Sequence, residues 1–198
     1  MTGCSRPLAV VRGCALVMPR NSQCFLKGTN IRTAEGDRKV ENLSLGDLLP
    51  TVFGGICPIQ WIGRYSLKKS DPTKGWVKKM LPVRVARSVL GLDVPCADLY
   101  VTKEHALLID GVLVTAGSLI NGTTITVYDP RVLDELEFFH IKLERHNAIY
   151  AEGAPCETII NVEESAVNLP NIFVTMDIQQ PKKRRARHCS AAMAVEAK

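Results

Sequence analysis

The chain has 198 residues, 46% of them apolar and 23% charged, which is the balance of an ordinary globular domain with a sizeable core. No apolar run approaches the roughly 18 residues that a membrane-spanning helix needs, so we expect no membrane segment. The chain has 25 basic and 20 acidic side chains, and residues 181–198 hold six of the basic and one of the acidic ones. The net charge of +5 therefore arises entirely in this tail. The balanced remainder gives no electrostatic reason to expect nucleic acid binding.

Seven cysteines are spread along the chain, at positions 4, 14, 24, 57, 96, 156 and 189. An odd number without a tight pattern argues against a disulfide framework and favours a reducing compartment. There is no CxxC motif, and the four histidines complete no zinc spacing, so we expect no metal and no other cofactor. Residues 8–18 resemble a signal sequence poorly, because Arg12 interrupts them and no small-residue cleavage box follows. A cytoplasmic location is favoured, with leaderless export as an alternative.

Residues 1–23 show neither a helical nor a strand period, and we expect them to be a leader or flanking peptide. From Cys24 onward, short apolar runs alternate with turn dipeptides. Asp110 and Gly111 separate two such runs, which predicts a β-hairpin because both central residues of a tight hairpin turn need a positive φ.

Further strands are expected at residues 125–127, 137–144 and 148–151. In the second of these, Phe139 and alternate residues form an apolar face, and His140 lies on the opposite, more polar face. The one helical element expected is a short turn within residues 40–48. Many short strands and no sustained helical period predict a compact all-β domain.

Two segments are expected to lie outside the regular structure. Residues 66–80 are rich in lysine and contain Pro72 and Gly75, which predicts an exposed loop. Residues 163–198 lose periodicity and are expected to be a C-terminal extension, whose basic and Ala-rich end at 181–198 is disordered. The basic run resembles a nuclear targeting string, although a solvated tail is favoured.

Three blocks of sequence carry the candidate chemistry. The first reads CFLKGTNIRTAEG from Cys24, followed by VENLSLGDL, the second is TKEHALL at 102–108, and the third is FFHIKLERHNAIYAEG at 138–153. In this order they resemble the Hint domains that Hedgehog autoprocessing regions and inteins share, and most closely the bacterial Hint proteins that are neither. The resemblance implies a horseshoe-like, all-β Hint domain over residues 24–162 that processes its own chain.

The chemistry of such a domain follows from the residues. The Cys24 thiol can attack the carbonyl of Gln23 through a five-membered ring, which converts an amide into a thioester. Because the amide is the more stable of the two, the departing nitrogen must be protonated and the oxyanion stabilised. The resemblance assigns the first task to His105, and it has Thr102 donate to the carbonyl oxygen or orient it. The alternatives are a satisfied polar His105, an ordinary strand Thr102 and a buried, inert Cys24.

The family pattern breaks in the third block and after it. Inteins end on a His-Asn pair followed by a nucleophile, whereas Ala-Pro-Cys-Glu-Thr follows here after Gly153. His146 and Asn147 lie one strand too early for that part, so cleavage at Cys24 is expected and splicing is not. Inteins often carry Asp at the position of His140. In this chain His140 either assists proton transfer from Cys24 or faces solvent. His146 resembles an intein residue that supports late proton transfer, and Cys156 is a candidate second nucleophile.

The expected substrate is the chain's own N-terminal flanking peptide, with water or another small nucleophile as acyl acceptor and the protein a monomer. The residues that follow the domain lack the apolar content of the Hedgehog sterol-binding segment. Two other functions stay open: a catalytically silent Hint fold that serves binding or secretion, and a thiol peptidase that acts on other chains.

Overall fold

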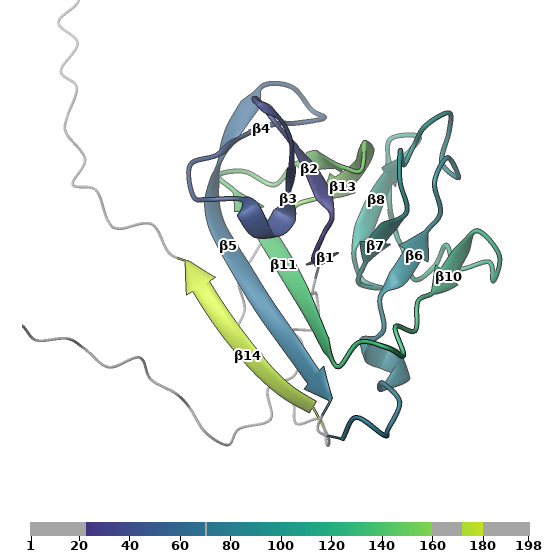
Figure 1. The fold of residues 1–198 in the computed structure, drawn as a ribbon. Helices are drawn as coiled ribbons and strands as arrows, with labels where there is room; N and C mark the ends of the chain where they lie inside the picture. The colour runs from purple at the N-terminus through teal and green to yellow at the C-terminus, as the bar shows by residue number, and fades with distance from the viewer. Residues whose placement is uncertain (1–22, 70, 160–171, 180–198) are drawn as a thin grey trace, which may run out of the picture.

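The computed structural model describes residues 23–69, 71–159 and 172–179, and these residues are nearly all β, as the sequence predicts (Figure 1). Their non-β elements are two short 3₁₀ helices, η1 (Val40–Asn42) and η2 (Lys78–Met80). The leader at 1–22 and the basic end at 181–198 lie outside the described residues. The described residues include no helix of the length and hydropathy needed to cross a membrane.

The strands form two antiparallel sheets. The first contains β1 (Phe25–Leu26), β4 (Leu48–Pro50), β5 (Ile56–Lys69), β6 (Val83–Val85), β7 (Leu99–Val101), β10 (Ile125–Val127), β11 (Glu135–Leu143) and β14 (Ile172–Gln179). The second contains β2 (Asn30–Thr33), β3 (Gly36–Lys39), β8 (Ala106–Ile109), β9 (Val112–Thr115), β12 (Ala148–Ala151) and β13 (Ala154–Glu157). The first sheet runs in the order β10-β6-β7-β1-β11-β5-β14, with β4 also paired to β5. The second runs in the order β3-β2-β12-β13-β8-β9.

Local sequence signals account for several of these elements. Asp110 and Gly111 have φ values of 50° and 80°, and they join β8 to β9 as the predicted hairpin. The strands expected at 125–127 and 148–151 are β10 and β12, and the strand expected at 137–144 is β11, which starts at Glu135. The helical turn expected within 40–48 is the single turn η1. The prediction of an all-β domain is confirmed.

The prediction of an exposed loop over residues 66–80 was wrong at both of its ends, which lie in β5 and η2. The long strand β5 continues to Lys69, because β11 pairs with it as far as the contact between Glu135 and Lys68. Trp76 is buried, and its indole N–H donates to the Leu133 carbonyl oxygen at 3.1 Å. Only residues 72–75 form the exposed stretch that the lysine, proline and glycine composition indicates.

One strand was not expected from the sequence. β14 pairs with β5 over eight residues, from Ile172 opposite Lys69 to Gln179 opposite Ile62. In Figure 1 it lies along the outer side of β5, which in turn lies beside β11. Strand β5 therefore has neighbours on both edges from Ile62 to Lys68.

Two apolar clusters cover the two faces of the central strands. One contains Phe25 and Phe139, and the other contains Leu26 and Phe138. Both faces of β1 and of the middle of β11 are therefore buried, so the face that carries His140 is covered there, although Glu144 just after the strand is exposed. A strand period identifies two faces, but the second cluster, built from distant segments, decides that neither of them meets water.

Candidate functional site

The sheet register brings the candidate residues together. Strand β1 lies between β11 and β7, with Phe25 opposite both Phe139 and Val101. Cys24 is the residue just before β1. Because the strands are antiparallel, Cys24 lies beside the residues that follow Phe139 and Val101, which are His140 and Thr102. Two residues far apart in the sequence thus flank the candidate nucleophile, which is fully buried.

His140 contacts the Cys24 thiol directly. Its Nε2 lies 2.9 Å from Sγ, and its ring is fully buried. The Tyr65 ring meets the His140 ring edge-on with centroids 4.8 Å apart, and the Trp61 ring lies 6.3 Å away. Burial lowers the pKa of His140 to about 3, as does the nearby His105, while the Gln23 backbone carbonyl opposes the shift. The alternative of a solvent-facing His140 was wrong, and the ring is neutral at physiological pH.

Thr102 holds the backbone of Cys24 on its other side. Its Oγ1 accepts the Cys24 backbone N–H at 3.1 Å, and its own N–H donates to the Cys24 carbonyl oxygen at 3.1 Å. The nitrogen that would depart from Gln23 is therefore held by a hydroxyl group. The expected donation from Thr102 to the Gln23 carbonyl oxygen stays a prediction.

His105 is buried without a hydrogen bond to either ring nitrogen among the described residues. Its ring lies 4.4 Å from that of Phe25, between centroids, in a tilted arrangement. Burial lowers the pKa of His105 to about 4, although the backbone carbonyls of Cys24 and Glu157 act in the opposite direction. Neither ring nitrogen makes a hydrogen bond of ordinary geometry within the described residues, but two backbone carbonyls act on the ring, so the alternative of a satisfied polar histidine stays open.

Glu157 was not singled out from the sequence, although it lies at this site. Its Oε2 accepts the side-chain N–H of Gln23 at 2.8 Å, and its Oε1 lies 2.7 Å from Nε2 of His146. His146 thus connects to the residue in front of the candidate nucleophile through a buried carboxylate. The sequence signal that could have identified Glu157 is that it is a single acidic residue at the end of the short, otherwise apolar strand β13.

The other thiols differ from Cys24 in their surroundings. Cys156 is fully buried in the larger apolar cluster, and burial raises the pKa of its thiol well above the ordinary range. Such a thiol is a poor nucleophile, which argues against Cys156 as a second acyl acceptor. Cys96 is exposed and Cys57 is partly buried, whereas Cys24 is fully buried.

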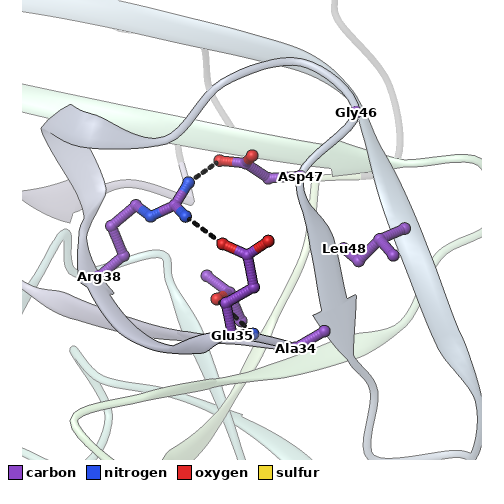
Figure 2. Close-up of a pocket in the computed structure, with 7 residues that line it drawn as sticks. Ala34, Glu35, Arg38, Gly46, Asp47 and Leu48 are labelled. Atoms are coloured by element: carbon purple, nitrogen blue, oxygen red, sulfur yellow. Dashed lines mark hydrogen bonds and ion pairs between the residues drawn. The ribbon is translucent and has the colours of Figure 1, made fainter.

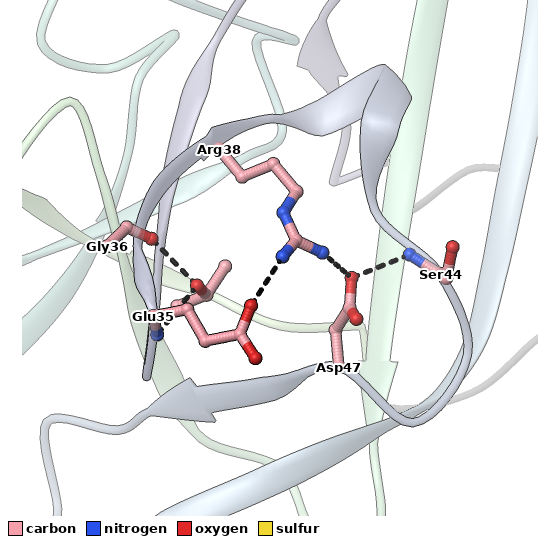
Figure 3. Close-up of polar contacts among 6 residues, drawn as sticks. Glu35, Gly36, Arg38, Ser44 and Asp47 are labelled. Atoms are coloured by element: carbon pink, nitrogen blue, oxygen red, sulfur yellow. Dashed lines mark hydrogen bonds and ion pairs between the residues drawn. The ribbon is translucent and has the colours of Figure 1, made fainter.

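A separate pocket of about 240 Å³ lies at the turn between β2 and β3 and does not include these residues (Figure 2). Its one cationic side chain, Arg38, donates to Glu35 at 2.9 Å and to Asp47 at 2.7 Å. Figure 3 shows the same guanidinium between the two carboxylates, with Asp47 also accepting the Ser44 N–H. The one positive charge is shared by two carboxylates, so the pocket offers no unpaired cation and is acidic on balance.

Gly63 makes room for the aromatic wall of the site. It lies opposite His140 in the pairing of β5 with β11, and a Cβ added there would come within 2.3 Å of the Trp61 ring. We expect Gly63→Ala to lower the free energy of unfolding by about 1–3 kcal/mol, because the indole must move. Chemical denaturation measures this. Gly75→Ala, where the added Cβ meets no atom within 4 Å, is the matched control, and an equal loss in both variants would contradict the prediction.

The sequence profile of the Hint domain matches residues 23–163. No curated protein matches the chain. Among solved structures, the chain is similar to a GSH-linked, splice-inactive variant of the AceL NrdHF class 3 split intein. The identity is 10%, the alignment covers 71% of this chain and 100% of the other, and the TM-score is 0.29.

Proposed function

The chain belongs to the Hint domain family, a family of self-processing domains, and from this premise we propose that it cleaves itself at the bond between Gln23 and Cys24. The observation that carries the proposal is the pair of contacts at Cys24. Its Sγ lies 2.9 Å from His140 Nε2, and its amide N–H is bound by Thr102 Oγ1 at 3.1 Å. The attacking atom and the departing atom of an acyl shift thus each have a polar partner.

In the first step His140 takes the thiol proton and Sγ attacks the Gln23 carbonyl carbon. The low pKa of His140 keeps the resting ring neutral, so in the tautomer with an unprotonated Nε2 it has a site for this proton, but it also makes the ring a weak base. The thiolate and the imidazolium form side by side, and this opposite charge favours both ionised forms. Attack within adjacent residues of one chain needs no diffusional encounter.

In the second step the bond from the Gln23 carbonyl carbon to the Cys24 nitrogen breaks, and a thioester replaces the amide. His105 donates a proton to this nitrogen and recovers one from the His140 imidazolium, so one proton passes from sulfur to nitrogen. Two features support this role: the Cys24 backbone carbonyl acts on the His105 ring, and the ring is near enough to His140 to lower the pKa of that residue. Thr102 orients the departing N–H.

In the last step water or another small nucleophile attacks the thioester carbonyl, and Sγ leaves as a thiol. The released peptide ends at Gln23, and the remaining domain begins at Cys24. A buried Cys156 with a raised thiol pKa gives no second nucleophile, and this agrees with cleavage rather than splicing.

Intact-mass measurement of the full chain, with and without hydroxylamine at neutral pH, tests the proposal. We expect hydroxylamine to convert the chain into two fragments, 1–23 with a terminal hydroxamate and 24–198, at a rate independent of protein concentration. Cys96→Ala, which removes an exposed thiol, serves as the control and should cleave at the same rate.

An intact chain under these conditions contradicts the proposal and favours the silent Hint fold. A rate that increases with protein concentration favours a peptidase that acts on other chains instead.

A further inference from the structure

We propose that Glu157 selects the residue in front of the scissile bond: it binds the uncharged amide of Gln23 and discriminates against an acidic side chain there. The inference rests on the proposed function and adds a specificity for the upstream peptide. Glu157 acts through Gln23 rather than on the reacting atoms, so it is a positioning residue.

The geometry of the Glu157 carboxylate supports this assignment. The carboxylate is buried, and each of its oxygens has one partner: the Gln23 side-chain N–H on Oε2 at 2.8 Å, and the His146 Nε2 on Oε1 at 2.7 Å. A buried carboxylate is costly to leave unpaired, so these contacts also hold it in one orientation. A Glu157 carboxylate fixed in this way accepts hydrogen bonds, so it favours a side chain at position 23 that can donate one.

The other half of the Gln23 amide adds independent evidence. Its Oε1 is buried and has no hydrogen-bond partner among the described residues. The NH₂ group therefore makes the hydrogen bond of this amide among the described residues, and the oxygen gains none in return for its burial. A carboxylate at position 23 would replace the donor by a second negative charge next to Glu157, and such pairs of like charges are strongly disfavoured.

The contact can control the reaction because residue 23 carries the electrophilic carbonyl. The Gln23 side chain is anchored at the end of β13, while its backbone carbonyl lies near the His140 ring and raises the pKa of that ring. Anchoring the side chain restricts rotation of the carbonyl relative to Cys24 Sγ. Small misplacements of an electrophile reduce the rate of an intramolecular attack substantially.

A reversal of the pair tests the inference. We expect Gln23→Glu to slow hydroxylamine-dependent cleavage by about 10- to 100-fold, the size of a charge-assisted hydrogen bond. In the double variant Gln23→Glu with Glu157→Gln, the amide at 157 donates to the carboxylate at 23, and its oxygen remains an acceptor for His146. Cleavage should return to within about threefold of wild type, an effect that a merely structural residue would not show.

Glu144→Gln makes the same change of charge at an exposed residue and should not rescue Gln23→Glu. Circular dichroism and thermal unfolding of each variant identify any that fail to fold. Unaltered cleavage of a folded Gln23→Glu, or no rescue in a folded double variant, overturns the inference and leaves the proposed function intact. A wild-type chain that does not cleave rejects the proposed function itself.

Discussion

Cys24→Ala is expected to abolish cleavage between Gln23 and the following residue, with a rate reduced by at least about 10³-fold. The variant keeps the scissile bond and its hydrogen bond to Thr102 but lacks the sulfur that His140 contacts at 2.9 Å. Intact-mass analysis after incubation with hydroxylamine measures the loss. Without an internal nucleophile the bond is an ordinary amide, which hydroxylamine leaves intact.

Cys24→Ser is the informative companion variant, because a hydroxyl group can form an ester by the same route but is a weaker nucleophile near neutral pH. It should cleave more slowly than the wild-type chain and faster than the alanine variant. Persistent production of the 1–23 fragment by Cys24→Ala would show that another group performs the attack. Thermal unfolding of both variants controls for the small change in a fully buried side chain.

The free energy of unfolding is expected to fall as the pH drops below about 6.5. The cause is the burial that lowers the pKa of His140 to about 3 and of His105 to about 4. Between these values and about 6.5 the unfolded chain binds more protons than the folded chain, so stability rises with pH in this window and is lost as the pH falls through it. Each histidine accounts for about 2.5 kcal/mol of loss at about pH 4.5.

Urea unfolding at several pH values between about 5 and 7 measures this dependence, since carboxylates titrate mostly below that range. All chains carry Cys24→Ala so that they stay intact. In this background, the further change His140→Gln removes one titrating group. The slope of the free energy of unfolding against pH, taken at about pH 5.5, should then correspond to about one proton fewer taken up on unfolding than in Cys24→Ala alone. An unchanged slope in the glutamine variant would mean that His140 is not neutral in the folded protein.

The aromatic surroundings of His140 connect these two results. The Tyr65 and Trp61 rings exclude water from the imidazole, which makes it costly to charge in the resting protein. The same exclusion strengthens the attraction between an imidazolium and a thiolate once both have formed. Acid sensitivity of the fold and proton transfer from Cys24 are thus expected to share one physical origin in the proposed mechanism.

Short-range patterns in the sequence predict five of the fourteen described strands. Asp110 and Gly111 define their hairpin because the turn needs positive φ at two adjacent residues, a requirement that local sequence meets by itself. The covered middle of β11 and the continuation of β5 to Lys69 depend on contacts with distant segments, so composition alone misplaced them. β14 pairs with a strand more than a hundred residues earlier in the chain, which local periodicity cannot reveal.

The sequence by itself determined the family, the all-β class and the candidates Cys24, Thr102, His105 and His140, because each lies within a short recognisable block. Only the tertiary structure decided that His140 is buried against the thiol, that Thr102 accepts the Cys24 N–H, and that Glu157 binds Gln23. These contacts join residues between 78 and 134 positions apart. The physical reason is that sheet register is set by the combined packing of many strands, whereas sequence blocks report only their own residues.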